Sequence, residues 1–280
     1  MTPDSSDSMR DEIPLLALSR QIRAEIIETA YKTETIHIGG CLSCVDILIA
    51  LYYGVLSLRP DEPDWPDRDR FILSKGHAAL ALYTVLAHRG FFPIEQVATF
   101  NEERSCFTEH PVWKNLPGIE ATSGSLGHGL SIGIGMAVAA NLSKRLYRTF
   151  VLMSDGECDE GSVWEGALFA PAHRLKNLVV IVDYNKWQAC GRTCEIMDLS
   201  PLKEKFSAFG WDAYEVDGHD IGSMISLMKT ALRSPDRPIA IIAHTIKGKG
   251  VSFMEDDNNW HYRIPSAEDV MKAHMELKVE

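Results

Sequence analysis

Basic side chains are scarce in this sequence: 28 Lys and Arg stand against 39 Asp and Glu in 280 residues, which gives a formal net charge of −11. This balance argues against a nucleic-acid-binding protein, which needs a basic surface for phosphates. Long apolar runs are also lacking. The longest candidate, residues 130–142, is interrupted by Gly133 and Gly135 and falls short of the roughly 20 residues that a membrane-spanning helix needs. We therefore expect neither nucleic acid nor a membrane as a partner.

The 6 cysteines are too few for a disulfide scaffold of this length, so free thiols are expected. A zinc site built from Cys41, Cys44, Cys190 and Cys194 is disfavoured, because the second pair is loosely spaced. The N-terminal residues are polar and acidic and lack the basic and apolar regions of a secretory signal. A cytoplasmic protein is the expectation.

What the sequence does contain is typical of a globular chain, with 45% hydrophobic and 24% charged residues. This length and composition predict one large domain with a buried core. We expect a disordered leader over residues 1–12, the main domain over residues 13–265 and a helical C-terminal tail over residues 266–280.

Short apolar runs alternate with helical patterns along the chain, which is typical of an α/β protein. Such a pattern predicts a doubly wound, mainly parallel sheet with helices on both faces. An irregular stretch over residues 100–125 predicts a long functional loop. The expected strands are residues 70–74, 150–154, 178–182 and 239–243, and the expected helices are residues 15–31, 43–53, 77–89, 127–144, 162–173, 200–209 and 221–232.

Two polar residues follow neighbouring strands. Asp155 comes after one apolar strand and Asn185 after the next, so both side chains can reach the crevice at the carboxyl ends of the strands. Their oxygens suit Mg²⁺ or Ca²⁺, and Gly156 allows a backbone N–H to approach a phosphate closely. Taken singly, an Asp-Gly turn or a helix-entry Asn has a purely structural explanation.

Together these residues resemble the signature of thiamine-diphosphate enzymes, in which Gly-Asp-Gly ends one strand and an Asn follows it. The spacing in the chain is also similar to that signature, since Asn185 lies 30 residues after Asp155. Ser154 stands here in place of the first glycine. In that family the Asp, the Asn and a backbone carbonyl two residues beyond the Asn hold Mg²⁺ against the diphosphate. The resemblance implies thiamine diphosphate as cofactor and Asp155, Asn185 and the carbonyl of Trp187 as ligands of Mg²⁺, with Ca²⁺ as an alternative.

Histidine-containing segments make the resemblance specific to transketolases. Residues 37–43 read His-Ile-Gly-Gly-Cys-Leu-Ser, where that family has His-Pro-Gly-Gly-Ser-Leu-Ser. Further segments follow in the family's order: Ser-Lys-Gly-His ending at His77, His-Pro at His110 with Glu109 in place of a glycine, Gly-Ser-Leu-Gly from Gly124, and Asn-Trp-His ending at His261. The resemblance covers about residues 15–265.

The resemblance implies catalytic or binding roles for the four matched histidines. His77 and His261, with the backbone of Gly156, would contact the diphosphate. His37 and His110 would surround the reactive carbon of the cofactor and hold substrate hydroxyls.

Four more residues receive roles from the same resemblance. The carbonyl of Gly124 would accept a hydrogen bond from the cofactor's amino group, and Leu126 would pack beneath the bent cofactor. Glu160 and Glu165 match an acidic pair that such enzymes bury at the subunit interface.

In that family the glutamate that activates the cofactor lies on a second, pyrimidine-binding domain, and this chain ends soon after the first domain. The resemblance therefore implies the N-terminal subunit of a two-component transketolase that transfers a two-carbon ketol unit from a ketose or ketose phosphate to an aldehyde. The implied partner is a subunit with the pyrimidine-binding and C-terminal domains, in an α2β2 heterotetramer.

Other interpretations stay open from the sequence. One is the α subunit of a 2-oxo acid dehydrogenase, which shares the Asp and Asn pair, and another is a non-catalytic diphosphate-binding module. The glycines of residues 127–133 are similar to a dinucleotide loop, but no strand precedes them. Residues 247–250, Lys-Gly-Lys-Gly, lack the P-loop pattern and are interpreted as a mobile basic loop over the diphosphate site.

Overall fold

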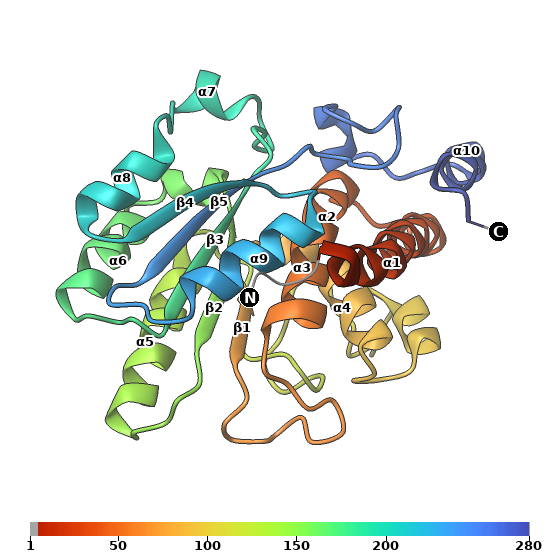
Figure 1. The fold of residues 1–280 in the computed structure, drawn as a ribbon. Coiled ribbons are helices and arrows are strands. Elements are labelled where there is room, and N and C mark those ends of the chain that lie inside the picture. The colour runs from red at the N-terminus through yellow and green to blue at the C-terminus, as the bar shows by residue number, and fades with distance from the viewer. Residues whose placement is uncertain (1–4, 280) are drawn as a thin grey trace.

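The computed structural model describes the backbone of residues 5–279 and the side chains of residues 14–279. Its centre is a sheet of five parallel strands in the order β1-β2-β3-β5-β4. Helices cover both faces of this sheet (Figure 1), which confirms the predicted doubly wound α/β architecture. The strands are β1 (Arg70–Leu73), β2 (Thr149–Ser154), β3 (Leu178–Tyr184), β4 (Asp212–Asp217) and β5 (Ile239–His244).

The helices form two layers. One layer comprises α1 (Ser5–Lys32), α2 (Ile38–Ser43), α3 (Val45–Ala50), α4 (Ala79–His88), α9 (Ile221–Ala231) and α10 (Ala267–Leu277). The other comprises α5 (His128–Leu142), α6 (Gly161–Ala172) and α8 (Leu202–Phe209). Shorter helical segments connect these elements: η1 (Leu51–Val55), η2 (Gly76–Ala78), η3 (Ile94–Thr99), η4 (Gly156–Asp159), α7 (Thr193–Ile196) and η5 (Asn258–His261).

Each face of the sheet has its own hydrophobic core. Phe150 and Leu152 of β2 pack in the first core, and Val151 and Met153 of the same strand pack in the second. Successive side chains of a strand point to opposite faces, so a strand covered on both sides must be apolar throughout. This is the physical origin of the unbroken apolar runs in the sequence.

The strand β4 was not among the predicted strands. It lies at the edge of the sheet, pairs only with β5 in the described structure, and is half-exposed along its length. Its sequence, Asp-Ala-Tyr-Glu-Val-Asp, therefore carries several acidic residues, which an inner strand could bury only with a partner for each charge.

The N-terminal prediction needs a correction. The helix α1 begins at Ser5, so it includes residues 5–12 of the expected disordered leader, while residues 1–4 lie outside the described residues. The helix includes Pro14, which lacks a backbone N–H and is a poor helix residue, and this made an extension towards Ser5 unexpected from the sequence. The helix α10 lies within the expected C-terminal tail and packs against α1.

The long irregular stretch and the free thiols are as predicted. Residues 101–127 carry no regular helix or strand, and all six cysteines are free.

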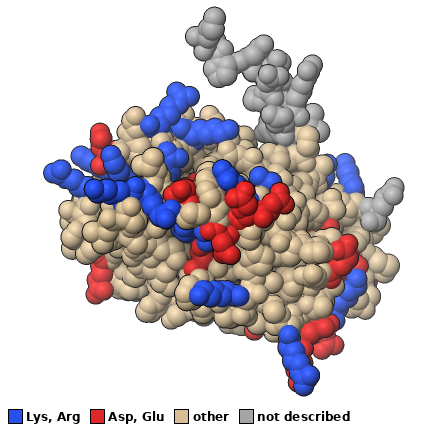
Figure 2. All heavy atoms as spheres, turned by 90° about the horizontal axis from the view of Figure 1, so that it is seen from below, with Lys and Arg blue, Asp and Glu red and all other residues tan. Residues whose placement is uncertain are grey.

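In the described part of the chain, no helix has the length and apolar character needed to span a membrane. The face seen from below (Figure 2) groups Lys and Arg side chains at one side and places acidic ones beside them, so the net charge of −11 is not spread as a uniform negative surface.

Two glycines of α5 provide a matched test of this packing. A Cβ on Gly133 would lie 2.5 Å from Cγ2 of Val151, whereas a Cβ on Gly135 would meet no atom within 4 Å. We expect Gly133→Ala to lower the free energy of unfolding by about 1–3 kcal/mol through overpacking. Gly135→Ala should instead raise it by up to about 1 kcal/mol, because alanine favours the helix. Urea denaturation of both variants measures this, and equal stabilities would contradict the helix register.

Candidate functional site

Polar residues follow four strands at the carboxyl edge of the sheet. Lys75 comes after β1, Asp155 after β2, Asn185 after β3 and Thr245 after β5. Because the strands are parallel and paired in register, these ends meet at one edge. Ligands of doubly wound sheets bind at this edge.

The predicted metal ligands lie side by side there. Oδ2 of Asp155 accepts a hydrogen bond of 2.8 Å from the backbone N–H of Lys186, which lies between Asn185 and Trp187. Oδ1 of Asn185 accepts a bond of 3.0 Å from the N–H of Trp187. The structure therefore brings Asp155, Asn185 and the backbone of Trp187 to one place.

The surroundings of Asp155 fit a cation. The carboxylate is fully buried, and its hydrogen-bond donors are neutral: the N–H groups of Gly156 and Lys186 and the hydroxyl of Thr193. Burial raises the pKa of Asp155 to about 7, because charge is costly without a counter-ion. A bound cation would remove that cost.

The rest of the donor set constrains how an ion could bind. Among the described side chains, those of residues 14–279, no group of three or more His, Cys, Asp and Glu could hold a metal ion. An ion beside Asp155 would need the amide oxygen of Asn185, a backbone carbonyl and oxygens of a bound ligand. Such a hard oxygen set suits Mg²⁺ or Ca²⁺ rather than zinc.

Three of the four predicted histidines form a cluster. The ring of His37 lies 5.6 Å from that of His77 and 4.9 Å from that of His261, measured between centroids, and the rings of His77 and His261 are 5.9 Å apart. The N–H of His37 also donates a bond of 2.9 Å to the carbonyl of His261. The cluster thus joins the N-terminal and C-terminal parts of the chain.

Burial keeps this cluster neutral. It lowers the pKa of His77 well below its usual range and that of His261 to about 3, and neighbouring positive charges act in the same direction. A neutral imidazole can donate one hydrogen bond and accept another. These rings are therefore suited to orient polar groups of a ligand rather than to supply positive charge.

The loop of residues 101–127 brings two more predicted residues, His110 and Gly124, to the site. A Cβ on Gly124 would lie 2.8 Å from Cδ2 of His110, and one on Gly76 would lie 2.8 Å from the backbone N of Gly124. The φ of Gly124 is +135°, which L side chains rarely adopt. The loop therefore lies directly on the turn before His77. Leu126, in the same loop, is 41% exposed.

The predicted interface acids lie on the surface of this chain. Glu160 directly precedes α6, Glu165 lies within it, and both side chains are exposed. A shallow pocket lies between α5 and α6, and its lining residues are Ser131, Ile134, Glu165, Gly166 and Phe169.

The sequence predictions missed a buried ion pair at the centre of the site. The ammonium of Lys75 pairs with the carboxylate of Asp183 and donates a bond of 2.9 Å to the carbonyl of Gly40. Asp183 also accepts bonds from the hydroxyls of Ser43 and Thr245. Burial opposes the charge on Lys75, but the Asp183 carboxylate outweighs this and raises the pKa of Lys75.

Both members of this pair stand at ends of apolar strands in the sequence. That position was an available signal, because a charged residue at the end of a buried strand needs a partner.

The interpretation of residues 247–250 as a mobile basic loop is wrong for Lys247, whose side chain is 1% exposed. Its Nζ donates to Oδ1 of Asn258 at 2.7 Å and lies 3.1 Å from Nδ1 of His261. The next N–H, of Gly248, donates to the carbonyl of Gly39. Burial lowers the pKa of Lys247 to about 8, so the amine stays largely protonated at neutral pH. Lys247 therefore places a positive charge beside the histidine cluster.

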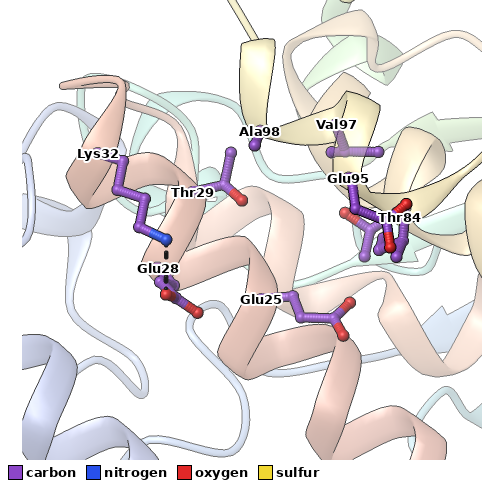
Figure 3. A pocket seen from close by; sticks show the side chains of 9 residues that line it. Glu25, Glu28, Thr29, Lys32, Thr84, Glu95, Val97 and Ala98 are labelled. Carbon is purple, nitrogen blue, oxygen red and sulfur yellow. Dashed lines mark hydrogen bonds and ion pairs between the residues drawn. The ribbon is translucent and has the colours of Figure 1, made fainter.

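Another surface pocket lies away from this site, between α1, α4 and η3 (Figure 3). It is lined by acidic side chains of Glu25, Glu28 and Glu95, and Glu28 pairs with Lys32 at 2.7 Å. None of the residues predicted for the functional site lies in it.

Comparison with known proteins adds independent information. Residues 16–280 match the family described as "Transketolase, thiamine diphosphate binding domain". The chain is 42% identical over 259 residues to a subunit of the apulose-4-phosphate transketolase of Phocaeicola vulgatus, covering 92% of each protein. It is 41% identical over 262 residues to "6-deoxy-6-sulfo-D-fructose transketolase subunit SqwG" of a Clostridium species, covering 94% of this chain and 95% of the relative.

The solved structures give the same fold. The transketolase of Campylobacter jejuni superposes with a TM-score of 0.86 at 28% identity, covering 95% of this chain but 42% of that one. The transketolase of Leishmania mexicana gives a TM-score of 0.87 at 26% identity, again covering 95% of this chain and 41% of the other. This chain therefore spans less than half the length of those enzymes.

The contact between Glu109 and His37 generates a testable prediction. Burial lowers the pKa of His37, and the Glu109 carboxylate, with Oε1 3.3 Å from Nδ1, partly counteracts this by favouring the protonated ring. Glu109→Gln should therefore lower the pKa of His37 further. Titration of the histidine ring resonances by NMR would show this, with His128 as an internal reference. An unchanged or raised pKa for His37 would mean that the carboxylate does not act on it.

Proposed function

Because this chain belongs to the transketolase family, as the part that binds thiamine diphosphate, we propose that it is the N-terminal subunit of a two-subunit transketolase. The relatives named as transketolase subunits match it over nearly their whole length, whereas single-chain transketolases are more than twice as long. The observation that carries the proposal is that Asp155, a buried carboxylate with only neutral donors, and the histidine cluster lie at the same edge of the sheet.

The proposed reaction transfers a two-carbon ketol unit from a ketose or ketose phosphate to an aldehyde. When bound, thiamine diphosphate supplies the nucleophilic carbon for this reaction. His77, His261 and the N–H of Gly156 would bind the diphosphate, and His37 and His110 would orient substrate hydroxyls. The neutral state of the histidine rings supports this, since each ring can donate to an anionic or hydroxyl oxygen.

We also propose Mg²⁺ as the ion beside Asp155. Asp155, Asn185 and the carbonyl of Trp187 would bind it, and diphosphate oxygens would complete its shell. The ion would anchor the diphosphate and balance the Asp155 charge. Gly124 and Leu126 would hold the cofactor from the loop that lies on the turn before His77.

The alternative function as the α subunit of a 2-oxo acid dehydrogenase accounts for Asp155 and Asn185 only. It gives no role to the contacts among His37, His77 and His261. A non-catalytic diphosphate-binding module has the same site as the proposed subunit, so only an activity measurement separates the two.

The proposed partner is a subunit with the pyrimidine-binding domain, which would supply the activating glutamate, in an α2β2 assembly. The surface of α5 and α6 is the candidate contact. Leu168 is 60% exposed and Phe169 is 41% exposed there, beside the exposed carboxylate of Glu165. Large apolar side chains grouped on one surface mark sites of association.

Co-expression with the adjacent reading frame tests the proposed function. We expect co-purification of the two chains and transfer of a ketol unit in the presence of Mg²⁺ and thiamine diphosphate. Binding of the cofactor by an assembled complex without any transfer would favour the non-catalytic module. Turnover of 2-oxo acids instead of ketose phosphates would favour the dehydrogenase.

Substitutions at the site test the ligand assignment. Asp155→Ala and Asn185→Ala should each abolish Mg²⁺-dependent binding of thiamine diphosphate by the co-expressed complex, because each removes a metal ligand. His77→Ala should weaken binding by a smaller amount, about 1–3 kcal/mol, since it removes one hydrogen bond to a charged group. Isothermal titration calorimetry measures these affinities, and circular dichroism controls for folding. Full Mg²⁺-dependent affinity in both metal-site variants would refute the assignment.

The partner surface has its own test. Leu168→Glu should weaken co-purification of the partner, by on the order of 2 kcal/mol or more if this side chain is a central contact. Met271→Glu is the control, because Met271 is 62% exposed on α10, across the sheet from α6. Equal co-purification of both variants would move the interface elsewhere.

A further inference from the structure

The turn after β3 closes on itself and reaches the proposed metal site. This turn, residues 185–193, contains Asn185 and Trp187, and Trp187 forms an antiparallel bridge with Arg192. At its far end the hydroxyl of Thr193 donates a bond of 2.9 Å to Asp155. Both ends of the turn therefore adjoin the proposed metal ligands. We call residues 185–193 the metal turn.

A second segment, residues 247–261, contains Lys247 and His261, and it contacts the metal turn through Asp256. Oδ1 of Asp256 accepts hydrogen bonds from Nη1 of Arg192 at 2.7 Å and from Nε1 of Trp187 at 2.8 Å. Oδ2 accepts from Nη2 of Arg192 at 2.6 Å. The guanidinium of Arg192 also lies 3.8 Å from the centroid of the Trp187 indole ring. One carboxylate thus fixes both strands of the metal turn.

A parallel connection runs through Asn258. Its Nδ2 donates a bond of 3.1 Å to the carbonyl of Ala189 at the tip of the metal turn. Its Oδ1 accepts the 2.7 Å bond from Lys247, whose Nζ lies 3.1 Å from Nδ1 of His261. The N–H of Asp256 donates to the carbonyl of Lys247 as well. A continuous set of hydrogen bonds therefore leads from the metal turn to the histidine cluster.

The electrostatics of Asp256 agree with this geometry. Its hydrogen bonds with Arg192 lower the pKa of Asp256, so the carboxylate is ionised at neutral pH. Its side chain is 54% exposed, and exposed ion pairs contribute little to the stability of a fold. Two parallel bonds between a carboxylate and a guanidinium nevertheless fix orientation well. The contact therefore fixes the orientation of Trp187 and Arg192 and adds little to the stability of the fold.

We propose that Asp256 is a positioning residue that clasps the metal turn to the segment with His261, so that the Trp187 carbonyl and His261 are held in place together. This inference rests on the proposed function, since it assigns Asp256 to the site that would hold Mg²⁺ and the diphosphate. Asp256 itself touches neither the ion nor the cofactor. It acts through Trp187 and Arg192 on one side and through the backbone of Lys247 on the other.

The test compares Asp256→Ala and Arg192→Ala, each in the complex co-expressed with the partner subunit. Titration with Mg²⁺ at saturating thiamine diphosphate should give an affinity for the ion that is on the order of tenfold weaker in each variant, as is usual when a group orienting a metal ligand is lost. The double variant should be no weaker than either single one, because both act through the same contact. The thermal midpoint without cofactor should stay unchanged in Arg192→Ala, because the φ of Arg192 is −66° and suits alanine, whereas Asp256 has a positive φ that alanine rarely adopts.

Hydrogen exchange supplies a readout that does not depend on metal or activity. Without cofactor, Asp256→Ala should speed amide exchange both in residues 186–192 and in residues 258–261, the two segments that the contacts of Asp256 hold together. Asp256→Asn keeps an oxygen for Trp187 and tolerates the φ of 58° found here, so it should show a smaller effect. The matched control is Asp67→Ala, since Asp67 is equally exposed at 54% and pairs with Arg145 at 2.8 Å.

The outcomes separate this proposal from the proposed function. Two results would overturn the positioning role of Asp256, provided that Asp155→Ala still loses binding. One is an affinity for Mg²⁺ within about twofold of wild type in Asp256→Ala. The other is additive losses of affinity in the double variant. If Asp155→Ala binds the ion and cofactor normally, the proposed function itself fails. Faster exchange in Asp67→Ala at the same residues would also overturn the positioning role of Asp256, because the faster exchange would then not be specific to the loss of its carboxylate.

Discussion

The site depends on one buried ion pair, between Lys75 at the end of β1 and Asp183 at the end of β3. Both side chains are fully buried, so each charge needs the other, and removing one partner of such a pair typically costs about 3–5 kcal/mol. The pair also gathers groups from α2 and β5: the carbonyl of Gly40, the hydroxyl of Ser43 and the hydroxyl of Thr245. The ends of β1, β3 and β5 and the helix α2 are thereby fixed relative to one another at this edge of the sheet. Asp155 and His77, which stand next to these residues in the chain or in the sheet, acquire their positions from this arrangement.

The charge distribution of the site follows from burial. The rings of His77 and His261 are kept neutral, and Asp155 has no cationic donor among its hydrogen-bond partners. Positive charge comes instead from Lys247, which is buried beside His261. In the proposed complex an anionic diphosphate would therefore be held by one metal ion and directed hydrogen bonds, with the charge of Lys247 beside His261, and not by a broadly basic surface. A chain with a net charge of −11 can bind an anion in this way because short-range contacts in a buried site are screened far less than surface charges.

The parts that sequence reasoning predicted are those set by local chemistry. The inner strands β2, β3 and β5 are apolar on both faces, and Asp155 and Asn185 follow two of them with side-chain oxygens at the carboxyl edge. The strand β4 was missed because an exposed edge relaxes the need for apolar residues, and residues 5–12 were wrongly expected to be disordered. Lys247 was expected on a mobile loop and is buried, because its partner Asn258 comes from a separate turn. The sequence alone cannot show such pairings, since whether a lysine is buried depends on what the fold places opposite its amine. The metal, cofactor, substrate and interface roles given to individual residues all stay predictions, those of Gly124, Leu126, Glu160 and Glu165 included.

The bond between the N–H of His37 and the carbonyl of His261 joins positions near the two ends of the chain. Between them lie all five strands, so the histidine cluster exists only when the sheet is complete. A ligand that binds this cluster therefore selects fully folded molecules and shifts the folding equilibrium towards them, by about RT ln(1 + [L]/Kd). The cofactor would then serve as a folding ligand for this protein, and cells short of it would hold a larger unfolded fraction exposed to proteases.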